Sequence, residues 1–225
     1  MTRTQQKIKV FIMCGGYYTN FDMPKSLTEI DGERLIDRTI RLLSAYETEP
    51  TVCCNAEDSV FDEFEPLRVD FTFDYQRQTG YYLDLFDSVP CNKPCIYLFG
   101  DVYYTEEAIQ AIISRYEATD RNVFICNAYP FNEQHLRQGE PFGWIVKDQK
   151  EFKCAIALCK RLEDRKVIDH ANGVASNWEL AHVINGLGIN DFCLRRDDCL
   201  VINDVTIDVD DPSVIETVER RVRNV

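Results

Sequence analysis

Apolar residues follow two patterns that alternate along the chain. Short apolar runs rich in valine, isoleucine, phenylalanine and cysteine are typical of buried strands. They predict strands over 7–13, 51–54, 69–73, 95–99, 122–126, 142–147, 191–194 and 199–202. Elsewhere apolar residues recur every three or four positions, which is typical of a helix with one buried face. Helices are therefore predicted over 33–46, 59–64, 81–88 and 152–162, and after Thr105, Ser176 and Asp211.

Polar residues at the predicted helix starts support these assignments. Thr105 is a favoured capping residue, and the two glutamates that follow it suit the positive end of the helix dipole. Ser176 and Glu179 have the spacing of a capping box. Asp211 precedes a proline, which is common at the first position of a helix.

The alternation of strands and helices predicts the fold class. It indicates a three-layer α/β/α fold with a mixed, mostly parallel sheet and helices on both faces. With 225 residues, 45% of them hydrophobic, the chain is expected to form one domain over 1–225. No repeat or linker divides it. The region of about 130–190 is less regular, and we expect it to form a substrate lobe inserted over the edge of the sheet.

Charge and hydropathy exclude some classes of partner. The formal net charge of −13 disfavours nucleic acid and anionic membranes. The sequence has no apolar run of membrane-spanning length, and residues 1–7 lack the apolar core of a secretory signal. We therefore expect a cytoplasmic protein.

The chain has ten cysteines, many of them inside apolar runs. Cysteine in such runs behaves as a small buried hydrophobic residue. Cys91 and Cys95 lie four apart, but no second pair follows at zinc-site spacing. Reduced, buried thiols are the favoured interpretation over a structural zinc site.

A glycine pair and a lysine are the first candidate site. The strand over 7–13 leads into Gly15 and Gly16, where backbone N–H groups can approach an anion closely. Lys25 follows a proline shortly afterwards and adds a positive charge at a set distance. This combination suits the phosphates of a nucleotide.

Acidic residues at two later positions are the second candidate site. Asp101 follows Gly100 at the end of the strand over 95–99, where a carboxylate can hold a hard cation such as Mg²⁺. A turn acid that caps the next helix is the alternative, although Thr105 already fills that role. Asp208 and Asp210 would share one side of an extended segment and suit a shared cation, while a solvated acidic loop is an equal alternative.

These motifs, in this order, resemble the nucleotidyltransferase superfamily of GT-A type. The superfamily contains the sugar-phosphate and phosphocholine nucleotidylyltransferases and the MobA-like NTP transferases. The matching segments, over nearly the whole chain, are Cys14–Asn20, Pro24–Lys25, Gly32–Ile36, Gly100–Asp101, Phe142–Val146 and Asp208–Pro212. The resemblance implies a Rossmann-like GT-A fold and Mg²⁺-dependent transfer of a nucleotidyl group from an NTP to a phosphorylated sugar or small alcohol, with release of pyrophosphate. Nucleotide-sugar or polysaccharide biosynthesis is the implied context, and a homodimer is compatible with it.

The resemblance also assigns roles to residues of this chain. Three residues are implied to be catalytic: Lys25, Asp101 and Asp210. Three are implied to bind the metal: Asp101, Asp208 and Asp210. Nucleotide contacts are implied for Cys14, Gly15, Gly16, Tyr17, Thr19, Gln76, Thr79 and Gly80, and acceptor contacts for Gly143, Lys147 and Trp178.

Simpler interpretations stand beside several of these roles. Trp178 also suits a core position, Lys147 a solvated surface, and Thr79–Gly80 a loop before a helix. The sequence departs from the family pattern at Tyr18 and Asn20, where the family has a glycine and a phosphate-binding arginine. A non-catalytic nucleotide-binding subunit and a GT-A glycosyltransferase that uses a nucleotide-sugar donor are therefore the alternative functions.

Overall fold

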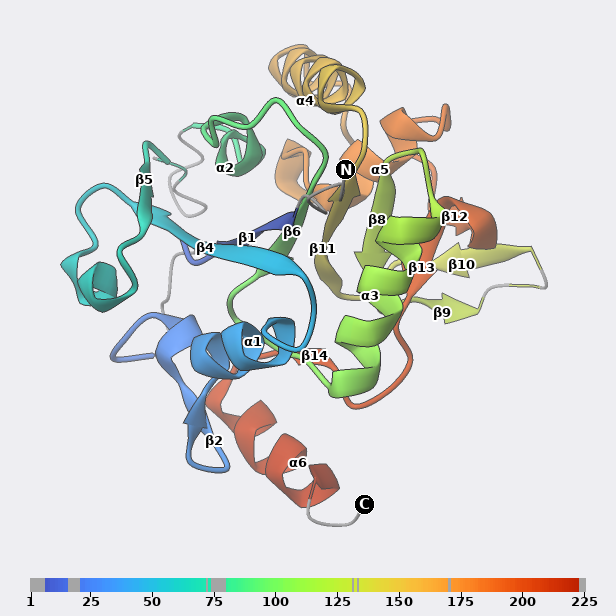
Figure 1. Ribbon diagram of the computed structural model, residues 1–225. Helices are drawn as coiled ribbons and strands as arrows, with labels where there is room; N and C mark the ends of the chain where they lie inside the picture. Colours follow the sequence, from blue (N-terminus) through green and yellow to red (C-terminus); the bar gives the residue numbers. More distant parts are fainter. Residues whose placement is uncertain are drawn as a thin grey trace, which may run out of the picture.

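The computed structural model describes residues 7–15, 21–71, 73, 80–130, 132, 134–169 and 171–222, and a seven-stranded sheet runs through its middle (Figure 1). In spatial order the strands are β13 (Cys199–Val201), β8 (Val123–Cys126), β11 (Pro141–Val146), β6 (Cys95–Phe99), β1 (Ile8–Met13), β4 (Thr48–Asn55) and β5 (Leu67–Val69). Neighbouring strands are parallel except where β11 runs antiparallel between β8 and β6. The predicted mixed, mostly parallel sheet is confirmed.

Helices cover both faces of this sheet, which gives the three predicted layers (Figure 1). On one side lie α2 (Asp84–Asp87), α4 (Gln149–Asp164) and α5 (Asn177–Ile184). On the other side lie α1 (Leu35–Leu43) and α3 (Glu106–Ala118). The last helix, α6 (Pro212–Val222), packs near the first hairpin, away from the central sheet. Short 3₁₀ turns lie at η1 (Lys25–Leu27), η2 (Ser59–Phe64), η3 (Ala171–Gly173) and η4 (Arg196–Asp198).

Three small sheets complete the fold. The strands β12 (Cys193–Arg195), β10 (His135–Arg137) and β9 (Tyr129–Pro130) form one antiparallel sheet. The strands β14 (Ile207–Asp208) and β7 (Val102–Tyr103) form the second, and β2 (Glu29–Ile30) and β3 (Glu33–Arg34) form the third. Among the helices of the described ranges, none is both long and apolar enough to cross a lipid bilayer.

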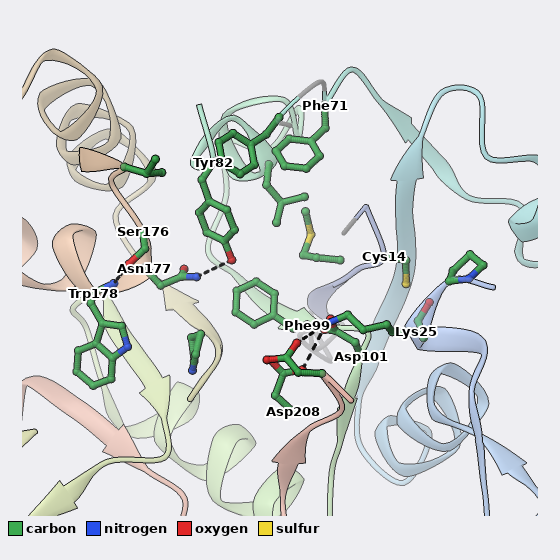
Figure 2. A pocket seen from close by; sticks show the side chains of 18 of the residues that line it. Cys14, Lys25, Phe71, Tyr82, Phe99, Asp101, Ser176, Asn177, Trp178 and Asp208 are labelled. Carbon is green, nitrogen blue, oxygen red and sulfur yellow. Dashed lines mark hydrogen bonds and ion pairs between the residues drawn. The ribbon is translucent and has the colours of Figure 1, made fainter. Parts of the chain in front are cut away.

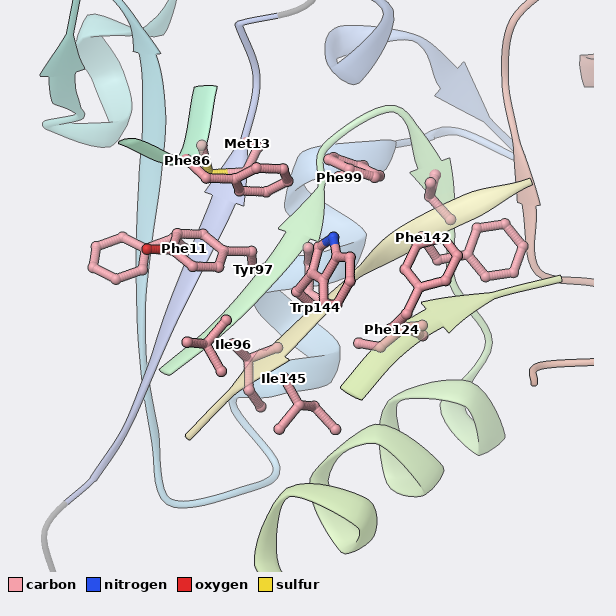
Figure 3. Close-up of a cluster of buried hydrophobic side chains, with 14 of the residues drawn as sticks. Phe11, Met13, Phe86, Ile96, Tyr97, Phe99, Phe124, Phe142, Trp144 and Ile145 are labelled. Atoms are coloured by element: carbon pink, nitrogen blue, oxygen red, sulfur yellow. The ribbon is translucent and has the colours of Figure 1, made fainter. Parts of the chain in front are cut away.

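Aromatic side chains fill the core between the sheet and the layer of α2 and α4 (Figure 3). Tyr97 of β6 stacks on Phe152 of α4 with 6.0 Å between ring centroids, and Phe86 of α2 meets Tyr97 edge-on at 5.2 Å. Trp144 of β11 extends this group toward Phe124 of β8 at 4.9 Å. These contacts join α2 and α4 to β6, and β11 to β8.

The helix predicted over 33–46 begins only at Leu35, because the two residues before it belong to a hairpin. Glu29 pairs with Arg34 and Ile30 with Glu33 across a two-residue turn. Both turn residues, Asp31 and Gly32, have positive φ angles of 54° and 80°. An Asp-Gly pair is a strong signal for this kind of tight hairpin turn, and it prevails here over the helical periodicity.

Other predicted boundaries also shift. The strand predicted over 69–73 is β5, which ends at Val69, and the strand predicted over 51–54 extends over all of β4. The strands β7, β9, β10 and β14 were not predicted. Within the predicted substrate lobe, β11 lies in the middle of the central sheet rather than over its edge. The single-domain count and the role of the remaining lobe stay predictions.

Candidate active site

The candidate site begins where β1 and β6 end side by side. Met13 pairs with Phe99, and the Gly100 N–H donates to the Met13 carbonyl at 2.9 Å. A Cβ atom on Gly100 would lie 2.5 Å from the Cys14 sulfur. Glycine at this position therefore lets the two strand ends approach each other, as expected for the ligand-binding edge of an open α/β sheet.

Lys25 meets three carboxylates at this edge, and Figure 2 labels two of them, Asp101 and Asp208. Its Nζ lies 2.8 Å from Asp101 Oδ2, 2.5 Å from Asp210 Oδ1 and 4.0 Å from Asp208 Oδ1. The lysine begins η1 directly after a proline, and its side chain is 14% exposed. Four of the residues singled out in the sequence thus converge on one point, although they come from three distant segments.

Pairing between β14 and β7 brings the two late aspartates to Asp101. Asp208 lies opposite Val102, and the Val209 N–H donates to the Asp101 carbonyl at 3.0 Å. Val209 is fully buried, while the residues on either side of it both reach Lys25. This is the alternation of an extended segment, with Asp208 and Asp210 on one side. The Asp208 side chain is the more enclosed, at 17% exposed against 71% for Asp210.

Burial and neighbouring charges shift the pKa values of this cluster. Burial disfavours the charged form of Lys25, but the charges of Asp101 and Asp208 outweigh it, so the pKa of the ammonium lies above its ordinary value. Burial and the charge of Asp101 raise the pKa of the Asp208 carboxyl well above its ordinary value, although Lys25 acts in the opposite direction. One ammonium therefore does not balance three carboxylates.

The three carboxylates also fit a hard divalent cation. One oxygen from each of Asp101, Asp208 and Asp210 lies within 4.8 Å of the other two. Asp208 Oδ1 is buried and has no hydrogen-bond partner. Carboxylate oxygens are the ligands that Mg²⁺ prefers, and a buried acceptor without a donor is a costly arrangement that a cation would relieve.

A cavity of about 710 Å³ opens from this cluster (Figure 2). The charged side chains of its described lining are Lys25 and the three aspartates, all at one end. The remainder is mostly apolar and aromatic, with Phe71, Phe73, Tyr82, Phe99 and Trp178 among the lining residues. The cavity therefore joins a charged end to a neutral wall.

Tyr82 and Asn177 are two polar residues of that wall, and the sequence did not indicate either of them. Trp144 Nε1 can only donate, so its 2.9 Å contact fixes Asn177 Oδ1 as the acceptor. The Asn177 amide nitrogen then donates to the Tyr82 hydroxyl at 3.1 Å. The hydroxyl proton of Tyr82 is left to point elsewhere, and burial raises the pKa of the phenol so that it stays protonated. The one available signal was the capping box, which places Asn177 at the first position of α5.

The nucleotide contacts implied by the resemblance are only partly visible. Cys14 lines the cavity, and a Cβ atom on Gly15 would lie 3.5 Å from Phe71 and Leu85, which also line it. Gly80 is exposed, with a φ of 78°, and is not part of the lining. The following residues lie outside the described residues: Gly16, Tyr17, Tyr18, Thr19, Asn20, Gln76 and Thr79.

The three residues predicted to contact the acceptor lie in different surroundings. Trp178 lines the cavity, is 6% exposed and donates from Nε1 to the Gly139 carbonyl at 3.2 Å. Gly143 is a sheet residue with a φ of 153°, and a Cβ atom there would lie 2.0 Å from the Tyr97 carbonyl oxygen. Glycine at this position is needed for the close approach of β11 to β6, and the acceptor contact of Gly143 stays a prediction.

Lys147 lies at the other end of the sheet from the carboxylates. Because β11 is antiparallel to β6, its last residue, Val146, pairs with Cys95 at the start of β6. The length of that strand, roughly 15 Å, separates Lys147 from the site. The ammonium of Lys147 instead lies over the ring of Tyr116, 3.5 Å from its centroid. The predicted acceptor contact of Lys147 is wrong, because the direction of β11 places this lysine away from the carboxylates.

Comparisons with known proteins identify the family and the fold of this chain. The model of the MobA-like NTP transferase domain family matches residues 10–170, and the chain belongs to this family. A comparison with curated proteins finds no match.

Similar solved structures share the fold over nearly the whole chain. The 2-C-methyl-D-erythritol 4-phosphate cytidylyltransferase of Thermus thermophilus is 10% identical, with a TM-score of 0.56 and coverage of 96% of this chain and 99% of that one. The CTP:phosphocholine cytidylyltransferase of Streptococcus pneumoniae is 11% identical, with a TM-score of 0.56 and coverage of 96% and 99%. The inositol-1-phosphate CTP transferase of T. maritima is 11% identical, with a TM-score of 0.55 and coverage of 97% of each chain. The expected nucleotidyltransferase fold is thereby confirmed.

Proposed function

We propose that this protein is a Mg²⁺-dependent nucleotidyltransferase that transfers NMP from an NTP to a phosphorylated small molecule. The observation that carries the proposal is the convergence of Lys25, Asp101 and the two late aspartates at the ends of β1 and β6. Membership of the family supports it. The apolar part of the cavity suits a nucleobase and the uncharged part of the acceptor. The charged end suits the phosphates of both substrates.

Asp101, Asp208 and Asp210 are the residues that would hold Mg²⁺, which supplies a Lewis acid for phosphate oxygens when bound. The reaction breaks the bond between the α- and β-phosphates, so pyrophosphate leaves as the acceptor phosphate oxygen attacks the α-phosphorus. The attacking group is already an anion, and the reaction therefore needs no protein nucleophile. Positioning and electrostatic stabilisation are the work left to the protein.

Different residues of this chain contribute to positioning and to electrostatic stabilisation. Lys25 supplies the positive charge for the triphosphate, since it is the basic side chain among the described residues that line the cavity. Tyr82 can donate its hydroxyl proton to an oxygen of either substrate, because Asn177 occupies the acceptor side of that hydroxyl. The aromatic wall excludes water from the reacting phosphates, which strengthens both interactions.

Assays of pyrophosphate release test the proposal. Each of the four NTPs is incubated with Mg²⁺ and a panel of phosphorylated sugars and alcohols, starting with CTP because the similar structures named above act with CTP or transfer a cytidylyl group. We expect release that depends on one NTP and one acceptor, and a loss of about 100-fold or more in Asp101→Asn. The matched control is Asp120→Asn, an exposed carboxylate that is not part of the lining.

Two results would contradict this function. NTP binding without turnover across the whole panel indicates a non-catalytic nucleotide-binding subunit, which the departures at Tyr18 and Asn20 would then explain. Hydrolysis or transfer with a nucleotide-sugar donor, and none with an NTP, indicates a glycosyltransferase.

A further inference from the structure

The ammonium of Lys25 contacts the same three side chains that a divalent cation would need. It lies within hydrogen-bond distance of Asp101 and Asp210 and 4.0 Å from Asp208. Those same three side chains make up the group that could hold a metal ion. The lysine side chain is 14% exposed, so this is an enclosed contact rather than a loose surface pair. The cluster therefore already contains a cation supplied by the chain itself.

A divalent ion and this ammonium exclude each other at close range. Both would lie among the same three carboxylates, and like charges a few ångströms apart repel strongly in an enclosed site. The ammonium keeps a charged partner on leaving only where another anion accepts it. Among the described residues that line the cavity, the aspartates are the acidic side chains, and they are the ones the metal would occupy.

A triphosphate is the ligand that resolves this competition. Its oxygens can accept the ammonium, and the carboxylates are then free for the metal. We propose that Lys25 is a resident counter-ion that keeps free divalent cations out of the carboxylate site until an NTP draws it away. The proposal rests on the proposed function, because it takes the NTP as the ligand. Its consequence is positive coupling, so that metal and nucleotide bind tightly only together.

Binding of Mn²⁺ to the nucleotide-free protein tests the proposal directly. The free Mn²⁺ signal in electron paramagnetic resonance gives the affinity of the wild type and of Lys25→Met. We expect Lys25→Met to bind Mn²⁺ at least about tenfold more tightly than the wild type, because the competing charge is gone. Lys9→Met is the matched control, since that ammonium pairs with Glu49 on an edge away from the cavity, and we expect no change. Adding Asp101→Asn to Lys25→Met should abolish the gained affinity.

An equal or weaker affinity in Lys25→Met would overturn the proposal. The measurement uses neither nucleotide nor acceptor, so it gives an answer even if the pyrophosphate assay finds no turnover. Circular dichroism and the melting temperature establish whether Lys25→Met is folded.

A second measurement needs no variant. Reductive methylation of the wild-type protein, read at Lys25 by mass spectrometry, should be slow and should stay slow with millimolar Mn²⁺ alone. Faster methylation of Lys25 on addition of Mn²⁺ alone would show that the metal displaces the lysine unaided, which contradicts the proposal.

Discussion

Asp208 is the most informative single residue of the site, because its carboxylate is enclosed and incompletely satisfied. One of its oxygens is buried without a hydrogen-bond partner, and its backbone is fixed by pairing with β7. Asp210 is largely exposed and contacts Lys25 from the rim. The resemblance to known nucleotidyltransferases implied Asp210 as the second catalytic carboxylate. The geometry gives Asp208 the stronger claim to a bound cation.

We therefore predict different effects for the two aspartates. Asp208→Asn should lower the rate of pyrophosphate release about 100-fold, since a buried ligand held in place loses its charge. Asp210→Asn should lower it less than about tenfold, because solvent screens an exposed carboxylate. Steady-state rates at saturating Mg²⁺ check this. A larger loss in Asp210→Asn than in Asp208→Asn would return the main role to Asp210.

A second prediction concerns the effect of a side chain at Gly143 on stability. Gly143→Ala places a Cβ atom 2.0 Å from the Tyr97 carbonyl oxygen at a φ of 153°. The backbone of β6 must move, so we expect a loss of about 3 kcal/mol or more in the free energy of unfolding. Gly32→Ala is the matched control, because it also has a positive φ but meets no atom within 4 Å. It should cost about 1 kcal/mol. Urea denaturation measures both, and equal losses would mean that the close approach of β11 to β6 contributes nothing.

At the scale of the element, α5 carries a cap that also positions the cavity wall. The Trp178 N–H donates to Ser176 Oγ at 3.2 Å, and the Ser176 N–H donates to Glu179 Oε2 at 2.6 Å. Asn177, which holds the Tyr82 hydroxyl, is the first residue after the cap. The stability of this helix end and the orientation of Tyr82 are therefore linked.

Ser176→Ala is predicted to lower the free energy of unfolding by about 1 kcal/mol through the lost cap. It should also weaken substrate binding, because Asn177 loses its fixed position. Ser114→Ala, at an exposed site inside α3, is the control. It should change the free energy of unfolding by less than about 0.5 kcal/mol and leave the KM for the NTP unchanged. Thermal unfolding and the KM for the NTP are the measurements. If stability falls without a change in KM, the cap has no part in the site.

Local signals account for the elements that the sequence predicted well. The apolar run of β6, the Thr105 cap of α3 and the capping box of α5 are each contained within a few neighbouring residues. The Asp31–Gly32 turn was also local, but the helical periodicity beyond it masked it. The direction of β11 was not predictable, because a run of apolar residues looks the same in either direction. That is why Lys147 was assigned to the wrong end of the sheet.

At the scale of the whole molecule, the site depends on the last part of the chain returning to the first. A second hydrophobic cluster joins Ile30 of β2, Tyr103 of β7 and Val218 of α6, with Val209 also at its centre. Val209 of this cluster is the neighbour of Asp208 and Asp210, which line the cavity, so we expect docking of α6 to affect the placement of these carboxylates. Such contacts between distant segments leave no local pattern. The resemblance predicted that these acids share one metal site, and the folded chain shows the contacts that bring them together.

The net charge of −13 opposes the binding of an anionic substrate. A polyanionic nucleotide must approach a molecule of the same sign, so binding requires positive charge concentrated at one point. Lys25 supplies part of it in the described part of the cavity, and under the proposed function Mg²⁺ would supply the rest. Binding of an NTP should therefore depend strongly on Mg²⁺.

Isothermal titration of the NTP identified by the pyrophosphate assay, with and without Mg²⁺, tests this account most directly. The wild type should bind it at least about tenfold more tightly with Mg²⁺, and the double variant Asp101→Asn, Asp208→Asn should show no such gain. An equal Mg²⁺-dependent gain in the double variant would show that the metal and the triphosphate bind elsewhere.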